Sequence, residues 1–580
     1  MSRNRNRRNA LFLFLSFVFS TACQSKLHLV EPSQGRTLES YQAVGKKAMV
    51  VTPNREATKI GIAVLKKGGS AVDAAIAVSF ALSVLRPQST GLGGGGFMLI
   101  YDHKNKKTVA LNFREFAPLK SKANMFIKKG VLDPKLAQEG GLAVAVPRFV
   151  AGMGDIYDFY ASKKVPWSDL IGPSIDLAER GFSVYPHLAH AIEEKRDVLN
   201  HFSPSKNIFV PNGNPLKEGE MLIQKDLAKT LKAVAQKGWA GFYQGPIAAD
   251  ILRSVQRAGG IMTIDDLWHV EPIPAEPVAS TYRGYKIVSM PPPSSGGITL
   301  MEILNILENF PIARQGPYNP KTVHEVVEAM KRAFLDRAKY LGDPRFIKMP
   351  VKGLLSKEYA EELAGSIDPQ KATPSKNLSP LESNSSLHES TTHFSIVDEE
   401  GNAVASTQTI NGYFGSGLVA QGSGIVLNNE MDDFSIEPGV PNAYGLIGGE
   451  ANVVAPGKIP LSSMTPTFVF DSKGDLVFVL GSPGGPKIIT AVLETLLHSI
   501  DFKAKPLEAV AAKRYHHQWI PDVLQYEEGI FSQKLERQLT AMGHSLQETK
   551  APWLIMLIAR SKEGFIGVSD PRGVGSAIGE

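Results

Sequence analysis

The sequence is almost free of cysteine. Among 580 residues only Cys23 is present, so no intramolecular disulfide can form and no later thiol can act as a nucleophile. Two other hydrolase signatures are also missing. The chain has no His-Glu-x-x-His motif, which a zinc peptidase needs, and no Gly-x-Ser-x-Gly turn, which presents the nucleophile of a serine α/β-hydrolase. The sequence therefore lacks the residues of all three of these enzyme classes.

Long apolar runs and a strong net charge are absent as well. After residue 30 no stretch of 18 or more apolar residues occurs, which excludes a membrane-spanning helix there. The net charge is +6, and four Arg near the N-terminus supply most of it. The rest of the chain is close to neutral and has no basic patch with interleaved aromatic residues. Nucleic acid is therefore not an expected partner.

The first 23 residues have the pattern of an export signal. Four Arg, at positions 3, 5, 7 and 8, precede an apolar run over 10–19 and then small residues. A buried helix is the alternative, which the N-terminal position and the flanking Arg disfavour. Cys23 follows like the Cys of a bacterial lipoprotein cleavage site, although Ser20 stands where such sites usually have Leu. We expect an exported, periplasmic protein with Cys23 as the lipidation candidate; simple cleavage is the second interpretation.

The most informative motif is Thr-Thr-His-Phe-Ser at 391–395, with Ser-Thr-Gln-Thr at 406–409. Upstream, residues 370–390 read QKATPSKNLSPLESNSSLHES, with six Ser and few apolar side chains. Such a segment buries too little apolar surface to offset its ordering entropy, so we expect it to be flexible and solvated. A loose run that ends at a Thr opening a strand is typical of a self-processing precursor. The freed α-amino group, with a pKa of roughly 7.7–8.0, can activate the Thr hydroxyl beside it.

The two motifs are predicted to face each other in a β-hairpin. The loop 399–401 has Gly at its third position, which suits a left-handed residue and fixes a register in which partner numbers sum to 800. Thr391 then lies opposite Thr409, and His393 opposite Thr407. A one-residue slip would turn Thr409 to the other face. The alternative is a hairpin with ordinary Thr-rich polar pairing.

Two further motifs are predicted to be structural. Residues 91–96 satisfy Gly-x-Gly-x-x-Gly, but a dinucleotide site needs a strand before this motif and a helix after it. Here the order is reversed, so we expect the glycines to permit close backbone packing near the site. His516 and His517 are adjacent and point to opposite sides of an extended segment. No further ligand lies at metal spacing, so we expect them to pack beside Trp519.

Helical and strand patterns alternate in both halves of the chain, which favours one layered domain over two unrelated ones. Apolar residues recur at helical spacing in the first half, and period-two patterns prevail from residue 391 onward. The predicted helices are 55–68, 70–85, 166–181, 225–237, 246–259, 297–309, 321–340 and 487–500, and the predicted strands are 97–101, 108–111, 392–398, 403–410, 465–470 and 476–480.

The stretch TTHFSIVDEEGNAVASTQTINGYFGSG, at 391–417, resembles the catalytic signature of the γ-glutamyltransferases. The likeness covers nearly the whole chain, in seven further blocks that keep the family's order. It implies an α+β fold, the N-terminal-nucleophile hydrolase sandwich of two stacked antiparallel sheets between helical layers. The blocks are 65–100, NFREFAP at 112–118, LNNEMDDFS at 427–435, PLSSMTPT at 460–467, GSPGG at 481–485, HHQW at 516–519 and SDPR at 569–572.

The resemblance also implies roles for particular residues. Thr391 would be the nucleophile, Thr409 would position it, and the backbone N–H groups of Gly484 and Gly485 would form an oxyanion hole. The remaining residues would bind the γ-glutamyl group by its two charged ends, which selects an α-amino acid. Arg114, Ser462 and Ser463 match the family's residues for the α-carboxylate, and Asp433, helped by Asn411 and Glu430, matches the acid for the α-amino group.

Three segments qualify the resemblance. Residues 438–452, PGVPNAYGLIGGEAN, are similar to the lid loop of many bacterial members, with Tyr444 closing the pocket; an ordinary surface loop is the alternative. Pro486-Lys487 follows the glycines where the family more often has a small polar residue and Arg. APWLIM at 551–556 replaces a small, polar stretch of many relatives, which affects the expected shape of the acceptor side.

We therefore interpret the sequence as an exported γ-glutamyltransferase that cleaves itself between Ser390 and Thr391. The parts would be the signal 1–23, a large subunit 24–390 with a processed linker at 370–390, and a small catalytic subunit 391–580. The γ-glutamyl group of glutathione or a similar amide would pass through a Thr391 ester to water, an amino acid or a dipeptide, with no metal or organic cofactor. The alternatives are a cephalosporin acylase or poly-γ-glutamate hydrolase, and, outside enzymes, an inactive exported binding lipoprotein.

Overall fold

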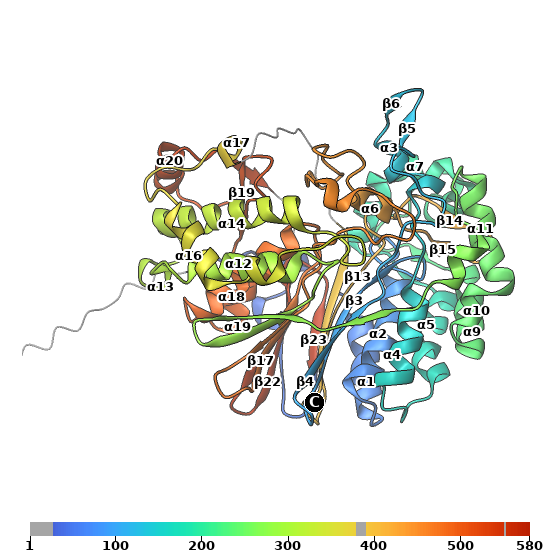
Figure 1. Ribbon diagram of the computed structural model, residues 1–580. Coiled ribbons are helices and arrows are strands. Elements are labelled where there is room, and N and C mark those ends of the chain that lie inside the picture. Colours follow the sequence, from blue (N-terminus) through green and yellow to red (C-terminus); the bar gives the residue numbers. More distant parts are fainter. Residues whose placement is uncertain (1–26, 379–389, 550–552) are drawn as a thin grey trace, which may run out of the picture.

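Two seven-stranded antiparallel sheets lie face to face between layers of helices (Figure 1). The computed structural model describes residues 27–378, 390–549 and 553–580. The two stacked antiparallel sheets between helical layers confirm the expected sandwich fold. The first sheet has the strand order β1 (Gln42–Gly45), β22 (Gly564–Ser569), β21 (Met556–Ser561), β17 (Leu476–Gly481), β16 (Thr467–Phe470), β11 (Tyr285–Ser289) and β10 (Val278–Tyr282). The second has the order β23 (Ser576–Gly579), β2 (Met49–Thr52), β12 (Thr392–Val397), β13 (Ala403–Thr409), β3 (Gly95–Asp102), β4 (Lys107–Asn112) and β9 (Ile273–Ala275).

Alternating side chains divide the core into three apolar layers. Met49 and Val51 of β2 point toward the other sheet, where they join a cluster that includes Phe468 and Ile558. The residue between them, Val50, points to the helices on the other side. This period-two division follows from the pleat of a strand. Because both faces of the sheet are covered, β2, β12 and β13 are buried along their whole length, including polar side chains such as Thr392 and His393.

The helices form two groups, one outside each sheet. α1, α2, α4 and α5 cover the second sheet, and α12, α14 and α18 cover the first (Figure 1). α2 begins with a capping box between Ser70 and Asp73. The long helices are α1 (Arg55–Lys66), α2 (Ala71–Leu85), α4 (Phe149–Tyr160), α5 (Trp167–Arg180), α6 (Pro186–Glu194), α9 (Lys225–Lys237), α11 (Gly245–Arg257), α12 (Gly296–Leu307), α14 (Pro320–Tyr340), α16 (Lys357–Gly365), α18 (Lys487–Ile500) and α20 (Gln533–Ala541).

Shorter elements complete the described chain, and each predicted helix and strand has its counterpart. The short helices are α3 (Lys135–Gln138), α7 (Arg196–His201), α8 (Ser203–Phe209), α10 (Ala240–Tyr243), α13 (Ile312–Gln315), α15 (Val351–Leu354), α17 (Ser375–Leu378) and α19 (Pro506–Ala511). The small sheets pair β5 (Ile127–Lys128) with β6 (Val131–Leu132), β7 (Phe182–Ser183) with β8 (Met221–Leu222), β14 (Val419–Ala420) with β15 (Ile425–Val426), and join β18 (Tyr515–His516), β19 (Leu524–Glu527) and β20 (Leu546–Thr549).

The predicted hairpin lies in the middle of the second sheet, with β12 between β2 and β13. Its register is the predicted one, since Thr392 pairs with Gln408 and His393 with Thr407. Gly401 has φ +85°, so the loop uses the left-handed conformation that glycine permits. Each sheet contains strands from before and from after residue 390, so the two parts of the chain share one layered structure.

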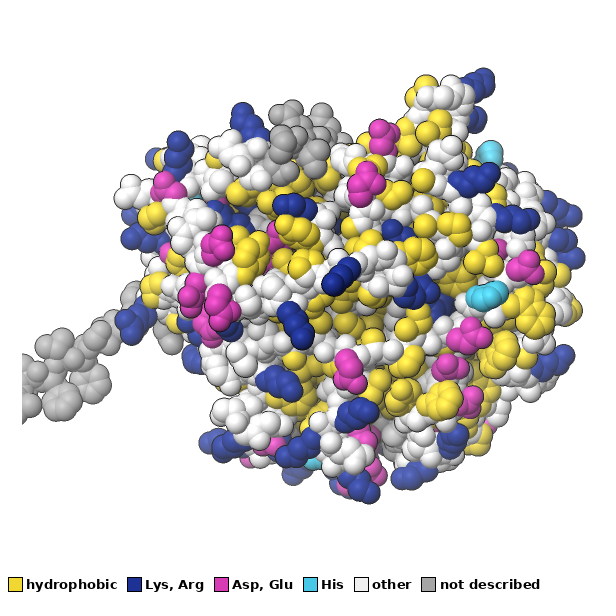
Figure 2. Space-filling view, viewed as in Figure 1, with side chains coloured by type: hydrophobic (Ala, Val, Ile, Leu, Met, Phe, Trp, Pro, Cys, Tyr) yellow, Lys and Arg dark blue, Asp and Glu magenta, His cyan; other side chains and the backbone are white. Residues whose placement is uncertain are grey.

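On the face in Figure 2, Lys and Arg side chains are interspersed with Asp and Glu and form no continuous basic stripe. No described helix is both long and apolar enough to cross a bilayer. The predicted signal and Cys23 lie outside the described residues, as do 379–389 of the predicted linker and Ala551 and Pro552.

Candidate active site

Thr391 directly precedes β12 and is almost fully buried. Its Oγ1 lies 3.3 Å from Oγ1 of Thr409, the residue that the predicted register places opposite. Thr409 Oγ1 also accepts a hydrogen bond of 2.8 Å from the backbone N–H of Asn411. The bond from Asn411 uses a lone pair of the Thr409 oxygen and leaves the hydroxyl proton of Thr409 available to donate toward Thr391. The arrangement can hold one threonine oxygen in a fixed direction.

The backbone around Thr391 is strained. Thr391 has φ +122°, a value that a β-branched residue rarely adopts. Strain of this kind persists only where surrounding structure enforces it, and it concentrates at functional sites. Here Ser390 is held by a hydrogen bond of 3.0 Å from its Oγ to the carbonyl oxygen of Gln88. The strained residue thus lies at the bond predicted to break.

The described parts of the predicted linker, 370–378 and 390, are exposed at Lys371, Lys376 and Asn377, as expected of a solvated segment, but two of the serines are buried. Ser390 is only 4% exposed. Ser375 is also buried, because its hydroxyl donates to the carbonyl oxygen of Trp519 and its N–H donates to Asp522. Composition did not identify these two serines as buried, because distant parts of the chain supply their hydrogen-bond partners.

Gly484 and Gly485 lie beside Thr391, at the turn between β17 and α18. Their φ values are +122° and +55°, so both positions require glycine. Within the described part of the chain, neither N–H donates a hydrogen bond, which leaves two donors for a ligand oxygen. Pro486 is the N-cap of α18, a position where a missing N–H costs no intrahelical bond, so this departure keeps the turn intact.

The predicted substrate residues meet in one cavity of about 20 Å³. Besides Thr391, Thr409 and Gly485, the cavity wall includes Arg114, Asn411, Glu430, Asp433, Tyr444, Ser462 and Ser463. Gly484 is the exception, because it lines a second cavity, whose wall also includes Thr391. A separate hollow of about 960 Å³, between α7, α8 and α11, contains no predicted site residue.

Arg114 is the central charge of the first cavity. Its two terminal nitrogens donate to Glu430 and Asp433, and its Nε donates to the carbonyl oxygen of Pro460. Burial, reinforced by Asp433 and opposed by Arg114, raises the pKa of Glu430 to about 8. Burial also raises the pKa of Asp433, again against the effect of Arg114. The guanidinium keeps one N–H on each terminal nitrogen, which is the pair of donors that a carboxylate accepts.

Arg337 is a second buried guanidinium at this cavity, and the sequence did not predict it. Its Nε donates to Ser295 Oγ at 2.9 Å and its Nη2 to Ser463 Oγ at 3.3 Å. Burial lowers the pKa of Arg337 to about 10, so the side chain stays charged near neutral pH. An Arg within the 21-residue helix α14 gives no motif signal; its place in the cavity wall distinguishes it from the other buried charges of that helix.

The segment 438–452 covers the cavity through Tyr444, which is 3% exposed. The Tyr444 hydroxyl donates to the carbonyl oxygen of Asn411 at 2.9 Å, and a Cβ on Gly485 would lie 2.6 Å from the Tyr444 ring. Asn442 fixes the turn, because its Oδ1 accepts from the N–H groups of Tyr444 and Leu446. The loop is therefore packed over the cavity.

The predicted structural motifs have the expected roles. A Cβ on Gly94 would lie 2.2 Å from the carbonyl oxygen of Thr409, so the glycine run permits close backbone packing at the site, as predicted. His517 accepts the N–H of Trp519, whereas His516 contacts Thr490 on the other side. His393 bonds Thr407 at 2.8 Å, and burial lowers its pKa to about 3.

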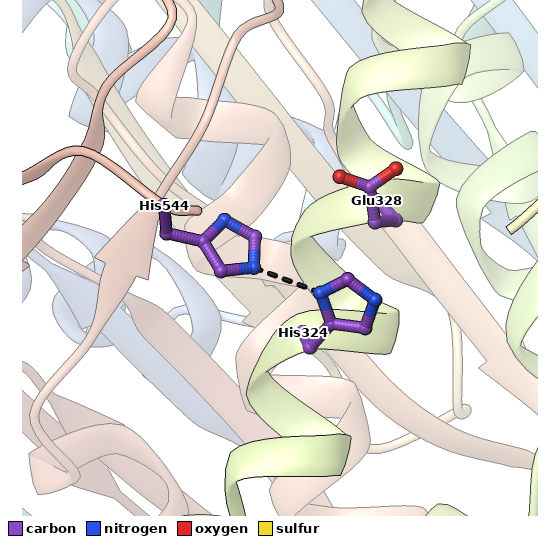
Figure 3. A group of neighbouring side chains, drawn as sticks. All are labelled: His324, Glu328 and His544. Atoms are coloured by element: carbon purple, nitrogen blue, oxygen red, sulfur yellow. Dashed lines mark hydrogen bonds between the residues drawn. The ribbon is translucent and has the colours of Figure 1, made fainter. Parts of the chain in front are cut away.

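One further cluster, His324, Glu328 and His544, was not predicted (Figure 3). His324 Nε2 donates to the carbonyl oxygen of Asp368, so its Nδ1 accepts from His544 Nε2 at 2.8 Å. Both Glu328 oxygens also have partners, which are Arg332 and the N–H of Thr373. The cluster is therefore a hydrogen-bonded network, and it ties α14 to segments on both sides of residue 390.

The fold and the buried threonine that precedes a central strand are those of N-terminal-nucleophile hydrolases. The gamma-glutamyltranspeptidase family model matches residues 57–580. The chain is 45% identical to the glutathione hydrolase proenzyme of Escherichia coli (strain K12) over 537 residues, covering 91% of each chain. The chain belongs to the gamma-glutamyltranspeptidase family.

Two solved structures agree with this assignment. The chain is similar to a cephalosporin acylase from Bacillus halodurans, with a TM-score of 0.82, 28% identity and coverage of 95% of this chain and 98% of that one. It is also similar to the gamma-glutamyltranspeptidase of Helicobacter pylori, with a TM-score of 0.54 and 42% identity over 57% of this chain and 96% of that one.

Proposed function

We propose that the chain is a precursor that cleaves itself between Ser390 and Thr391 and then transfers γ-glutamyl groups from glutathione and related amides. The observation that carries this proposal is the Thr391 hydroxyl, which lies 3.3 Å from Thr409 Oγ1. Thr391 lines a cavity of opposed charges and lies beside Gly484 and Gly485, whose N–H groups have no hydrogen-bond acceptor among the described residues. The name of the Escherichia coli relative, a glutathione hydrolase proenzyme, supports the substrate and the processing.

In processing, Thr391 Oγ1 attacks the carbonyl carbon of Ser390 and the peptide C–N bond breaks. The nitrogen takes the proton of the hydroxyl and becomes the α-amino group of Thr391. Water then hydrolyses the resulting ester, which leaves a carboxylate on Ser390 and restores the Thr391 hydroxyl. The products are a large subunit ending at Ser390 and a small subunit 391–580, held together by the shared sheets.

In turnover, the α-amino group of Thr391 takes the proton of its own hydroxyl as Oγ1 attacks the γ-carbonyl. The N–H groups of Gly484 and Gly485 stabilise the oxyanion, and one such donor is typically worth about 10²–10³ in rate. Arg114 with Ser462 and Ser463 holds the α-carboxylate. Asp433, Asn411 and Glu430 hold the α-amino group, and Tyr444 excludes water from the ester.

The test compares Thr391→Ala with Thr392→Ala. Thr392 is adjacent and fully buried, and its hydroxyl has no partner within the described residues, so it is a matched control. On a denaturing gel the first variant should remain one chain and the second should give two, the smaller beginning at Thr391 by Edman sequencing. A different N-terminus would refute the assignment of the nucleophile.

The related-enzyme alternatives are separated by donor chemistry. γ-Glutamyl-p-nitroanilide and glutaryl-p-nitroanilide differ only in the α-amino group. The two acids beside Arg114 favour the amine-bearing donor, and we expect kcat/KM to be at least tenfold higher for it. A preference for the glutaryl compound would support the cephalosporin acylase alternative, and hydrolysis of poly-γ-glutamate would support the other. An uncleaved, inactive wild type would support the binding lipoprotein.

We propose in addition that residues 1–23 direct export to the periplasm and that Cys23 carries a lipid anchor. The support is the basic and apolar pattern that precedes a lone Cys. Cys23→Ala should release active enzyme from the membrane fraction of its native host. A wild type that already fractionates as soluble would favour simple signal cleavage.

A further inference from the structure

The second cavity at Thr391 contains a buried cation with no acid partner. Arg86 follows α2, is 3% exposed, and lines this cavity with Ser390, Gly484 and Leu554. Its Nη2 makes one long contact of 3.4 Å, to Ser89 Oγ. Its Nε has no partner, and no described carboxylate pairs with it.

Other buried Arg side chains of the described chain have fuller sets of partners than Arg86: Arg148 donates to three backbone carbonyl oxygens and Arg337 to two serine hydroxyls, and several others form ion pairs. Arg514 pairs with Asp570 at 3.1 Å, Arg332 with Glu328 at 2.7 Å, and Arg114 with two acids. An unpaired buried charge is costly, because desolvation is not offset by an ion pair. The C-terminal dipole of α2 offsets only a small part of this cost. The position of Arg86 therefore suits a ligand that brings its own negative charge.

The position of the Thr391 nitrogen indicates that the leaving amine and the acceptor amine bind in this second cavity. In the intact chain, the nitrogen of Thr391 is bonded to the carbonyl carbon of Ser390, and Ser390 lies in the second cavity. After cleavage this nitrogen is the base that receives and returns protons. A leaving or attacking amine must come within hydrogen-bond reach of it. The side vacated by Ser390 meets this requirement, whereas the first cavity holds the γ-glutamyl group.

We propose that Arg86 binds the carboxylate of the leaving group and of the acceptor, and that the second cavity is their subsite. This inference rests on the proposed function. An acceptor with a free carboxylate, such as a dipeptide, would place that group on the guanidinium and its amine near Thr391. The amine attacks the γ-glutamyl ester, a new amide bond forms, the C–Oγ1 bond breaks, and Oγ1 regains a proton through the α-amino group.

The surroundings of Arg86 sharpen the predicted ligand class. Burial, with a smaller contribution from Arg86, lowers the pKa of His187 to about 3, so this neighbour is neutral near pH 7. Leu554 and Pro483 give the cavity an apolar wall. We therefore expect the site to prefer acceptors with a carboxylate and an apolar side chain. In the intact chain the cavity is only about 20 Å³, little more than one water, so cleavage and departure of Ser390 must open it.

The experiment uses cleaved enzyme with γ-glutamyl-p-nitroanilide as donor, and compares glycylglycine with glycylglycinamide. The two acceptors share the amine and differ in the charge of the other end. For wild type we expect the acceptor KM to be 10- to 100-fold lower for glycylglycine. Arg86→Gln should reduce this ratio to about two or less, and Arg86→Lys should give an intermediate ratio. Arg257→Gln removes an exposed charge on α11 that lines neither cavity at Thr391, and it should keep the wild-type ratio.

The outcomes separate this inference from the function on which it rests. Wild type that does not hydrolyse the donor would refute the proposed function. Wild type that hydrolyses the donor but accepts both dipeptides equally would overturn the role of Arg86 without any variant. An unchanged ratio in cleaved Arg86→Gln would also overturn it, and would indicate that Arg86 instead holds the new carboxylate of Ser390.

Discussion

The pairing of Thr409 with Thr391 can be tested by Thr409→Val, which replaces a hydroxyl with a methyl group of similar size. Two contacts are lost: the 3.3 Å contact to Thr391 Oγ1 and the 2.8 Å bond from the N–H of Asn411. The second loss leaves a buried N–H without a partner and should lower the free energy of unfolding by about 1–3 kcal/mol. The first removes a donor from an oxygen that becomes negative during attack. A hydrogen bond to a charged group contributes about 1.5–3 kcal/mol, equivalent to roughly 10- to 150-fold in rate.

Thr407→Val is the matched control. Thr407 is on the same strand and equally buried, and its hydroxyl bonds His393 Nδ1 at 2.8 Å. This variant should lose a similar amount of stability without touching Thr391. The assay follows self-cleavage of purified precursor on denaturing gels, kcat for γ-glutamyl-p-nitroanilide, and thermal unfolding. If both variants slow cleavage equally, lost stability accounts for the effect, and Thr409 has no role in positioning the nucleophile.

Three further predictions concern the charges and the cover of the site. Arg114→Lys should keep self-cleavage but raise the donor KM about 10- to 100-fold, because a point charge loses the bidentate contact; an unchanged KM would place the carboxylate elsewhere. Tyr444→Ala, or deletion of 440–449, should lower the ratio of transfer to hydrolysis while cleavage persists, and an unchanged ratio in both would contradict the lid role. Burial lowers the folded-state pKa of His544 to about 3, so protonation of the unfolded chain should reduce stability as pH falls below 6.5, by about 2 kcal/mol at pH 5. Between pH 7 and pH 5 the melting temperature of His544→Gln should therefore fall less than that of wild type. Equal falls would refute the assignment of this pH dependence to His544.

The hairpin was predictable because its determinants are local. Gly401 sets the turn, the turn sets the register, and the register alone brings Thr409 to Thr391. The helices were predictable for a similar reason, since their apolar spacing is written in consecutive turns. The substrate residues came from the family's motifs, and the structure brings them into one cavity although they are spread from Arg114 to Gly485.

The features that the sequence did not reveal depend on distant partners. Arg337 and Arg86 have no local pattern that separates them from exposed Arg residues; only their burial beside Thr391 does so. In the polar segment before residue 379, Lys376 and Asn377 are exposed as expected, yet Ser375 is buried and obtains its partners from Trp519 and Asp522. Composition predicts disorder where a segment has few apolar side chains. It contains no information about hydrogen-bond acceptors that a distant part of the chain supplies, such as the carbonyl oxygen of Trp519.

The position of Ser390 connects maturation with acceptor choice. The bond that must break to free the α-amino group of Thr391 also keeps a serine in the cavity that contains Arg86. The precursor therefore lacks both the base and the space for an acceptor, and a single cleavage supplies both. Strain at Thr391 lies at that same bond, so its release coincides with the opening of the cavity. On this reasoning the uncleaved precursor should bind neither glycylglycine nor glycylglycinamide, even though its γ-glutamyl cavity is intact.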